Sequence, residues 1–285
     1  MEMNYIRRGV GKPLLLIHGI GGDWRSWQTI LDDLAMERDV IAVDLPGHGD
    51  TPPLQSETTI ATLSDALTEF IHGNNLKGID VVGSSMGARL VLELARRGGV
   101  VGGAVSLDPG GFWQGWETDF FYHSINLSIK LIRALQPVAP QLTRNVISRS
   151  ILFAQFSARP WRLSPELALD TLRSYAASPV FDELLYNLAY GEKQKGAPKN
   201  SIKKPLVIGW GKRDLVCLPS QARRALKLFP DAYLHWFDRS GHFPLWDIPA
   251  ETTRLILDAT HGGEIAESIG TSLIKHSTKE NFQNN

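Results

Sequence analysis

The sequence of 285 residues has one cysteine, Cys217, no net charge and no long hydrophobic run. A single cysteine excludes an intrachain disulfide and indicates a reducing compartment, so we expect a soluble, cytoplasmic protein. The 30 basic and 30 acidic residues cancel, which argues against a nucleic-acid partner because such proteins usually carry a basic stripe. Apolar runs such as Leu14–Ile17 are too short to span a membrane, and residues 1–10 lack the features of a signal peptide.

The sequence also lacks internal repeats and low-complexity tracts, which argues against solenoids and propellers. What it has is an ordinary globular composition, with 43% hydrophobic and 21% charged residues. That balance is too apolar for a disordered chain. Length and composition therefore predict a globular protein of the size of an enzyme, but they do not indicate which reaction it catalyses.

Short runs rich in Val, Ile and Leu alternate with segments of helical periodicity. Such alternation is typical of a parallel sheet covered by helices on both faces. We therefore predict a doubly wound, mostly parallel α/β sheet. The predicted strands are 14–18, 40–44, 79–83, 100–108, 205–209 and 233–237, with a short one around 4–8, and the predicted helices are 27–37, 59–72, 86–97 and 220–229.

The alternation of strands and helices stops between Asp108 and about residue 200. Residues 118–191 read as several helices broken at prolines. A helical block inserted between two strands of one sheet predicts a cap or lid. We predict a core of residues 1–111 and 200–261, a helical cap with its return linker at 112–199, and a weakly ordered C-terminal segment at 262–285.

The strongest local motif is Gly83-Ser84-Ser85-Met86-Gly87, which lies between a predicted strand and a predicted helix. In that context G-x-S-x-G forms a sharp turn that exposes the central serine, and its glycines remove Cβ atoms that would clash. The helix N-terminus also favours developing negative charge. The motif predicts Ser85 as a nucleophile.

A serine nucleophile needs a base, and the base needs a carboxylate that orients it. His242 follows the last predicted strand, at the sheet edge where α/β sites lie. Asp214 follows the strand at 205–209, so Ser85, Asp214 and His242 occur in the chain order of a hydrolase triad. Asp108, at the end of an earlier strand, is the alternative acid, although it also reads as a turn former.

Acyl transfer needs N–H donors for the oxyanion. The residue after the nucleophile, Met86, supplies one backbone N–H, and Ile20 in the glycine-rich loop His18-Gly19-Ile20-Gly21-Gly22 supplies the other. Glycines at both sides of Ile20 let the backbone approach a substrate carbonyl. Phosphate binding by this loop is a weak alternative, since its spacing fits neither nucleotide motif.

Five segments occur in the order and rough spacing of the α/β-hydrolase superfamily: HGIGGDWRSW, DLPGHGDT, GSSMG, GWGKRD and SGHFPLWDIP. The sequence resembles the cap-bearing, serine esterase-like branch of that superfamily over about residues 4–260. The resemblance implies that Ser85 is the nucleophile, His242 the base and Asp214 the acid. It also implies that the backbone amides of Ile20 and Met86 form the oxyanion hole.

Two departures from the family pattern carry expectations of their own. Only one short strand precedes Leu14, so the first edge strand of the family is expected to be missing. A serine rather than a carboxylate at position 85 disfavours dehalogenase and epoxide hydrolase chemistry. The segment around His48 resembles an architectural turn of the family.

These residues together predict a serine hydrolase that cleaves the carboxylic ester of a small to medium apolar substrate, without cofactor or metal. Phe112, Trp113 and Trp116 are candidates for an apolar substrate pocket, although packing of the cap onto the sheet explains such aromatics equally well. Cleavage of a carbon–carbon bond in a diketone or dienoate is an alternative, favoured if cap arginines such as Arg133, Arg144 or Arg149 face Ser85. A ligand sensor with slow turnover is another. The sequence carries no prediction of the oligomeric state.

Overall fold

The computed structural model describes residues 2–260, so the predicted C-terminal segment at 262–285 lies outside the described residues. Within that range, seven strands form one sheet in the order β1-β3-β2-β4-β5-β6-β7. Every neighbouring pair is parallel except β1 and β3. The strands are β1 (Tyr5–Arg8), β2 (Pro13–Ile17), β3 (Asp39–Val43), β4 (Ile79–Ser84), β5 (Val101–Leu107), β6 (Leu206–Gly211) and β7 (Tyr233–Phe237).

This topology confirms the predicted doubly wound, mostly parallel sheet. It also confirms that a single short strand, β1, precedes β2 and forms the edge of the sheet in the described part of the chain. Strands β2, β3 and β4 are buried along nearly their whole length, because helices cover both faces. Continuous burial explains why their sequences read as unbroken apolar runs.

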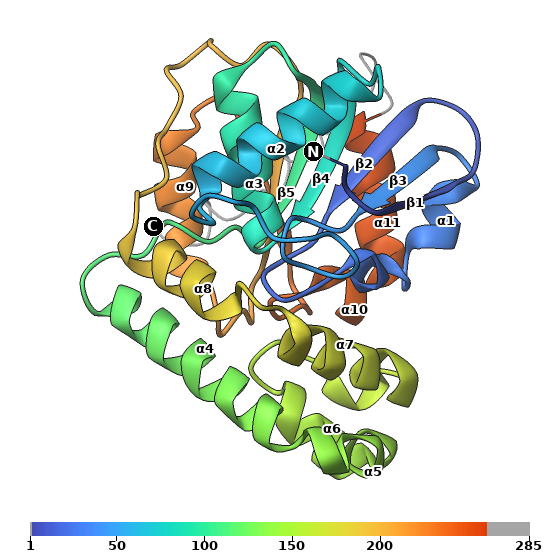
Figure 1. Cartoon of the computed structure of the whole chain (residues 1–285). Coiled ribbons are helices and arrows are strands. Elements are labelled where there is room, and N and C mark those ends of the chain that lie inside the picture. The colour runs from blue at the N-terminus through green and yellow to red at the C-terminus, as the bar shows by residue number, and fades with distance from the viewer. Residues whose placement is uncertain (1, 261–285) are drawn as a thin grey trace, which may run out of the picture.

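Helices α2 (Ile60–Gly73), α3 (Met86–Arg97) and α9 (Ala222–Leu228) cover one face of the sheet, and α1 (Leu31–Ala35) and α11 (Pro249–Thr260) cover the other (Figure 1). A short helix, α10 (Pro244–Asp247), precedes α11. The predicted helix at 27–37 is wrong in extent. The chain there forms a 3-10 turn, η1 (Trp24–Trp27), that Asp23 caps, and then the separate α1, whose N-cap residue Ile30 offers no capping side chain.

Five further helices lie between β5 and β6 and pack together at one end of the sheet (Figure 1). We call them, with two 3-10 turns, the helical insert. Side chains of the insert bind the loops of the sheet: Ser174 Oγ donates to the Gly21 carbonyl at 2.7 Å and Ser178 Oγ to the Gly47 carbonyl at 3.0 Å. The domain boundaries at 112 and 199 stay a prediction. The insert contains α4 (Trp116–Ala134), η2 (Gln136–Val138), α5 (Ala139–Arg144), α6 (Val146–Phe153), η3 (Pro160–Arg162), α7 (Pro165–Ala177) and α8 (Phe181–Tyr190).

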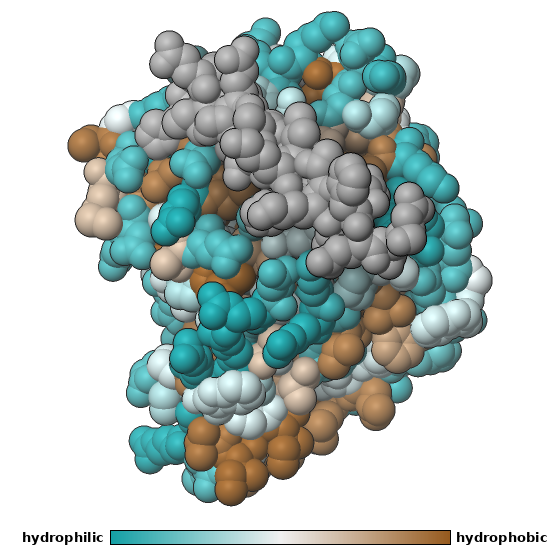
Figure 2. Space-filling view, turned by 180° about the vertical axis from the view of Figure 1, so that it is seen from behind, coloured by the Kyte–Doolittle hydropathy of each residue, from teal (hydrophilic) through white to brown (hydrophobic). Residues whose placement is uncertain are grey.

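The outer surface of the helical insert carries many hydrophobic side chains. Figure 2 shows them gathered at the end of the molecule that the insert forms. No helix among residues 2–260 is long and apolar enough to cross a membrane.

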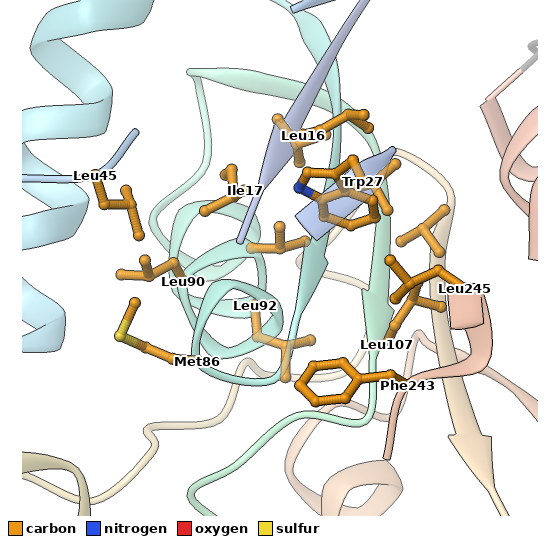
Figure 3. Close-up of a cluster of buried hydrophobic side chains, with 14 of the residues drawn as sticks. Leu16, Ile17, Trp27, Leu45, Met86, Leu90, Leu92, Leu107, Phe243 and Leu245 are labelled. Atoms are coloured by element: carbon orange, nitrogen blue, oxygen red, sulfur yellow. The ribbon is translucent and has the colours of Figure 1, made fainter. Parts of the chain in front are cut away.

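The core continues from the sheet to the loops that carry the candidate site (Figure 3). Leu16 and Ile17 at the end of β2 pack in one cluster with Leu90 of α3 and with Trp27. Met86, at the first position of α3, is buried in the same cluster. The carboxyl ends of the strands, where the candidate residues lie, therefore rest on a close-packed base.

Candidate active site

The turn between β4 and α3 holds Ser85 in a backbone conformation that few non-glycine residues adopt, with φ 56° and ψ −115°. The turn is closed so tightly that a Cβ atom at Gly83 would lie 2.1 Å from the Gly87 carbonyl oxygen. A Cβ atom at Gly87 would lie 2.1 Å from the carbonyl oxygen of Ile17. Both glycines of the motif are therefore required by the close approach of the backbone.

The structure brings Ser85, His242 and Asp214 into one hydrogen-bonded chain. Ser85 Oγ lies 2.8 Å from His242 Nε2, and His242 Nδ1 lies 2.8 Å from Asp214 Oδ2. The His242 and Asp214 side chains are buried. When Nδ1 carries the proton and donates a hydrogen bond to the carboxylate of Asp214, Nε2 is unprotonated and can accept the proton of the Ser85 hydroxyl. General-base activation of a serine requires this arrangement.

Asp214 lies in a turn after β6 that uses both of its carboxylate oxygens. Oδ2 faces His242, and Oδ1 accepts the backbone N–H groups of Val216 at 2.7 Å and Cys217 at 3.0 Å. These two bonds fix the rotamer of Asp214 and so fix the orientation of the imidazole. The lone cysteine contributes its backbone to this turn and is itself buried.

The alternative acid, Asp108, lies beside the chain of hydrogen bonds but does not face His242. Its Oδ1 accepts the N–H of Gly211 at 2.7 Å, just before the turn that carries Asp214. Burial, and then the charge of Asp214, raise the pKa of Asp108 well above its usual value. The geometry therefore favours Asp214 as the partner of His242, while Asp108 ties the end of β5 to β6.

Ile20 lies in the loop after β2, and Met86 directly follows Ser85 in the chain. Met86 is the first residue of α3, where backbone N–H groups have no partner within the helix. Among the backbone hydrogen bonds of residues 2–260, none uses the N–H of Ile20 or Met86. A Cβ atom at Gly19 would lie 3.1 Å from Ser85 Cβ, so the loop that carries Ile20 lies directly against the serine. Both amides remain candidates for the oxyanion hole.

His18 and His48 bind backbone atoms of the loops near the site and are not part of the Ser85–His242–Asp214 chain. His18 Nε2 accepts the N–H of Leu45 at 3.0 Å, while its Nδ1 lies 2.7 Å from the carbonyl oxygen of Gly19. The His48 ring lies 5.0 Å from the His18 ring, and its Nδ1 lies 3.1 Å from the Pro46 carbonyl oxygen. The two rings hold the loop that carries Ile20 to the loop after β3.

Asp247 is a site residue that the sequence reasoning missed, although it lies in the motif SGHFPLWDIP. Its buried carboxylate accepts the N–H of Gly241 at 2.7 Å and the N–H of Ala158 at 2.9 Å. Three more donors reach it, from Ser157 Oγ, Arg159 N and Ser240 Oγ. The backbone N–H of His242 itself donates to the Phe156 carbonyl at 2.9 Å. The loop of His242 is therefore fastened to the helical insert through Asp247 and Phe156.

A partly open apolar cavity of about 30 Å³ adjoins Ser85 and His242. Its lining contains no lysine, arginine, aspartate or glutamate, and its polar side chains are those of His242 and three hydroxyl residues. The phenol of Tyr175 is among them, and burial raises its pKa above the usual value. The lining residues are Ile20, Ser85, Phe121, Ile125, Ser128, Ile129, Ile132, Phe156, Tyr175, Phe181, Val216, His242 and Phe243.

Phe112, Trp113 and Trp116 are not among the residues that line this cavity, and their role in a substrate pocket stays a prediction. Phe112 packs against Trp210, with ring centres 6.3 Å apart, and Trp113 stacks behind Phe121 at 4.2 Å. Trp116 is 65% exposed on the outside of α4. Other insert aromatics line the cavity, and which of them point inward depends on how the helices pack.

The cap arginines do not face Ser85 either. Arg133 Nη1 binds Asp182 at 2.7 Å on the surface, Arg149 is buried within the insert on backbone carbonyls, and Arg144 is exposed. The cavity therefore lacks the cationic groups that an anionic substrate would need.

Side-chain atoms of Asp214, Cys217 and His242 lie within 4.8 Å of one another and form a possible metal-binding group. His242 and Asp214 are already hydrogen-bonded to each other. Burial raises the pKa of the Cys217 thiol, which disfavours the thiolate that metals bind. The arrangement suits proton transfer better than metal binding.

A serine on a strand–turn–helix elbow, with a histidine and an aspartate in hydrogen-bond contact, is the site of a hydrolase on an α/β sheet. The sequence profile of the alpha/beta hydrolase family matches residues 14–255. The chain belongs to that family.

Among curated relatives, the chain is 31% identical over 249 residues to the dihydrolipoyllysine-residue acetyltransferase component of the acetoin cleaving system of Cupriavidus necator. That match covers 81% of this chain and 61% of the relative, so the chain spans about three fifths of that protein. It is 24% identical over 270 residues to a 2-hydroxy-6-oxononadienedioate/2-hydroxy-6-oxononatrienedioate hydrolase of Pseudomonas putida, covering 90% of this chain and 91% of the relative.

Solved structures of this fold superpose over most of the chain. A thermophilic esterase from Thermogutta terrifontis has a TM-score of 0.67 at 19% identity, covering 89% of this chain and 91% of the esterase. A meta-cleavage product hydrolase from Pseudomonas fluorescens has a TM-score of 0.69 at 20% identity, covering 91% of this chain and 94% of that one. At these identities the likeness supports the fold, and the reaction must be argued from the site.

Proposed function

We propose that this hydrolase cleaves carboxylic esters of small apolar substrates through an acyl-enzyme on Ser85, with the helical insert acting as a cap. The observation that carries the proposal is the Ser85–His242–Asp214 chain facing a cavity without arginine or lysine. Ester substrates are neutral, and such a cavity buries their apolar groups without leaving a charge unpaired.

The proposed reaction proceeds in two halves. His242 Nε2 takes the proton of Ser85 as Oγ attacks the ester carbonyl, and the oxyanion accepts the N–H groups of Met86 and Ile20. His242 then gives the proton to the leaving alcohol, and the acyl group stays on Ser85. Water, deprotonated by His242, hydrolyses the acyl-enzyme and restores the serine hydroxyl.

The size of the cavity indicates the length of the acyl group. About 30 Å³ is far below the roughly 300 Å³ of an ordinary ligand pocket. A short acyl chain is therefore the group that this arrangement of the insert accommodates best. We expect acetate and butyrate esters to be hydrolysed faster than esters of long fatty acids.

Replacement of the nucleophile tests the proposal. Ser85→Ala is expected to lower kcat for p-nitrophenyl acetate by about 10⁴-fold or more, because covalent catalysis is lost. Labelling of the native chain with a fluorophosphonate, followed by peptide mapping, must place the label on Ser85. Label on another residue, or turnover by the variant at the native rate, would contradict the assignment.

Carbon–carbon bond cleavage is the competing reaction, since one relative is named a 2-hydroxy-6-oxononadienedioate hydrolase and structural neighbours are named meta-cleavage product hydrolases. A dienoate substrate is anionic, and Arg133, Arg144 and Arg149 lie away from the cavity. We therefore expect a meta-cleavage product to be turned over much more slowly than p-nitrophenyl acetate. The reverse preference would favour the alternative. A single burst of one product per chain, without steady turnover, would instead support the ligand-sensor hypothesis.

A further inference from the structure

Six aliphatic side chains on the outside of the helical insert are exposed to solvent, from 45% for Val138 to 72% for Ile151. Hydrophobic side chains gather at this end of the molecule (Figure 2). We call these six residues the outer patch. They are Leu127 and Leu131 of α4, Val138 of η2, and Val146, Ile147 and Ile151 of α6.

The outer patch lies on helices that are apolar on two sides. The inner face of α4 contributes Phe121, Ile125 and Ile129 to the cavity, while Leu127 and Leu131 point outward. A surface helix normally presents polar residues on its outer side. A cluster of exposed aliphatic side chains on adjacent elements therefore indicates a surface that contacts another protein or a membrane.

The segment of the chain that carries the outer patch is basic. Between Asp119 and Glu166 the sequence has six lysine or arginine residues and no aspartate or glutamate. Arg133 pairs with Asp182, and Arg149 is buried on carbonyl groups of the insert. The other four have no acidic partner among residues 2–260. They are Lys130, Arg144, Arg159 and Arg162.

We propose that the outer patch docks peripherally on an anionic lipid bilayer. The aliphatic side chains enter the boundary between headgroups and acyl chains, and the basic side chains contact lipid phosphates. Trp161, 55% exposed on η3, is a residue of the type that anchors proteins at this boundary. The combination of aliphatic residues with unpaired cations is the chemistry that such a surface recognises.

A second copy of the chain fits the same surface less well. In a two-fold dimer the patch would face itself, and the cations of both copies would meet without an acidic residue between Asp119 and Glu166 to pair with. A bilayer with anionic lipids supplies both an apolar interior and the opposite charge. The inference does not depend on which bond the active site cleaves.

Cosedimentation of the full-length chain with lipid vesicles tests the proposal. We expect binding to vesicles of phosphatidylcholine mixed with phosphatidylglycerol, weaker binding to phosphatidylcholine alone, and loss of binding at high salt. The double variant Ile147→Asp with Ile151→Asp should lower the partition coefficient by about tenfold or more, because two buried aliphatic contacts are lost. Lys130→Glu with Arg144→Glu should lower it by more than about tenfold on the anionic vesicles.

Matched controls separate docking from general hydrophobicity and from misfolding. Val10→Asp and Met36→Asp change exposed apolar residues outside the insert and should leave vesicle binding unchanged. All variants should keep fluorophosphonate labelling and the native circular dichroism spectrum. The proposal is overturned if the native chain does not bind anionic vesicles at low salt. It is equally overturned if the control variants lose as much vesicle binding as the patch variants. It is also overturned if the native chain is a dimer that Ile147→Asp with Ile151→Asp dissociates while vesicle binding stays absent.

Discussion

The carboxyl groups of Asp214 and Asp108 lie close together next to His242, and their different surroundings give them different roles. Asp214 has two backbone N–H donors on Oδ1 and His242 on Oδ2, which together fix its orientation. Asp108 is buried beside that charge, and its burial, the charge of Asp214 and a side-chain hydrogen bond to Asp214 raise its pKa. One charge on the pair is enough to orient the histidine.

Substitution by asparagine distinguishes these two tasks. Asp214→Asn should lower kcat for p-nitrophenyl acetate by about 10³- to 10⁴-fold, because the amide no longer holds His242 in the required tautomer. Asp108→Asn should change kcat by less than about tenfold, since a neutral amide replaces a carboxyl whose raised pKa favours its neutral form and keeps an acceptor for Gly211. Steady-state kinetics of both variants measure the difference. Equal losses would show that Asp108 acts as a charged partner.

At the scale of elements, the loop after β7 and the helical insert behave as one hydrogen-bonded assembly. Asp247 joins Gly241 to Ala158, and His242 N–H reaches Phe156, which also lines the cavity. A displacement of the insert near Phe156 therefore displaces the base. Misplacement of a catalytic group by about 1 Å lowers rates by roughly 10²-fold.

Removal of the carboxylate of Asp247 tests this connection. We expect Asp247→Ala to lower kcat by about 10- to 100-fold with a smaller change in KM, because His242 is misplaced while the cavity keeps its lining. The rate of fluorophosphonate labelling at Ser85 should fall in parallel. Asp33→Ala, at an exposed acid of α1, serves as the control. A lower melting temperature with unchanged kcat would show a role in stability alone.

The sequence was sufficient to predict the sheet and the three residues of the hydrogen-bonded chain. Strands buried on both faces read as continuous apolar runs, and the positions of Ser85, Asp214 and His242 follow from local motifs at strand ends. The cavity lining was not predictable in this way, because packing between helices decides that Phe121 points inward and Trp113 lies behind it. Asp247 was missed because its partner Ser157 lies 90 residues away in the chain.

At the scale of the whole molecule, two buried histidines connect loops that surround the site, and they make stability depend on pH. Burial, and then the neighbouring His18, lower the pKa of His48 to about 3. Burial also lowers the pKa of His18. In the unfolded chain both titrate near about pH 6.5. Below that pH the unfolded state binds more protons, so their contribution is complete above about pH 6.5 and falls as the pH decreases toward the folded pKa.

The substitution His48→Asn should remove the contribution of one titrating histidine to the pH dependence of the free energy of unfolding. For the native chain, each histidine lowers the free energy of unfolding by up to about 1.4 kcal/mol per pH unit, a slope that is reached about one pH unit below pH 6.5. The raised pKa of Asp108 acts in the opposite direction, and comparison with the variant cancels that effect. Urea unfolding at several pH values between 5 and 7 should give an average slope about 1 kcal/mol per pH unit shallower in the variant, with the difference approaching about 1.4 kcal/mol per pH unit near pH 5. Identical slopes would contradict a neutral His48 in the folded chain.

The sum of charges over the whole chain conceals how the charge is distributed. Acidic residues are absent between Asp119 and Glu166 while the total remains zero. A global isoelectric point therefore does not describe this segment of the helical insert, which is basic.

The buried position of Cys217 has a practical consequence for spectroscopy. Its thiol is inaccessible and its pKa is raised, so reagents that need an exposed thiolate will react with it slowly. Because the chain has no other cysteine, it already serves as a background for site-specific attachment of dyes or spin labels. A thiol introduced by Leu127→Cys would carry a reporter on the outside of α4, from which insertion into lipid or motion of the insert during turnover becomes directly observable.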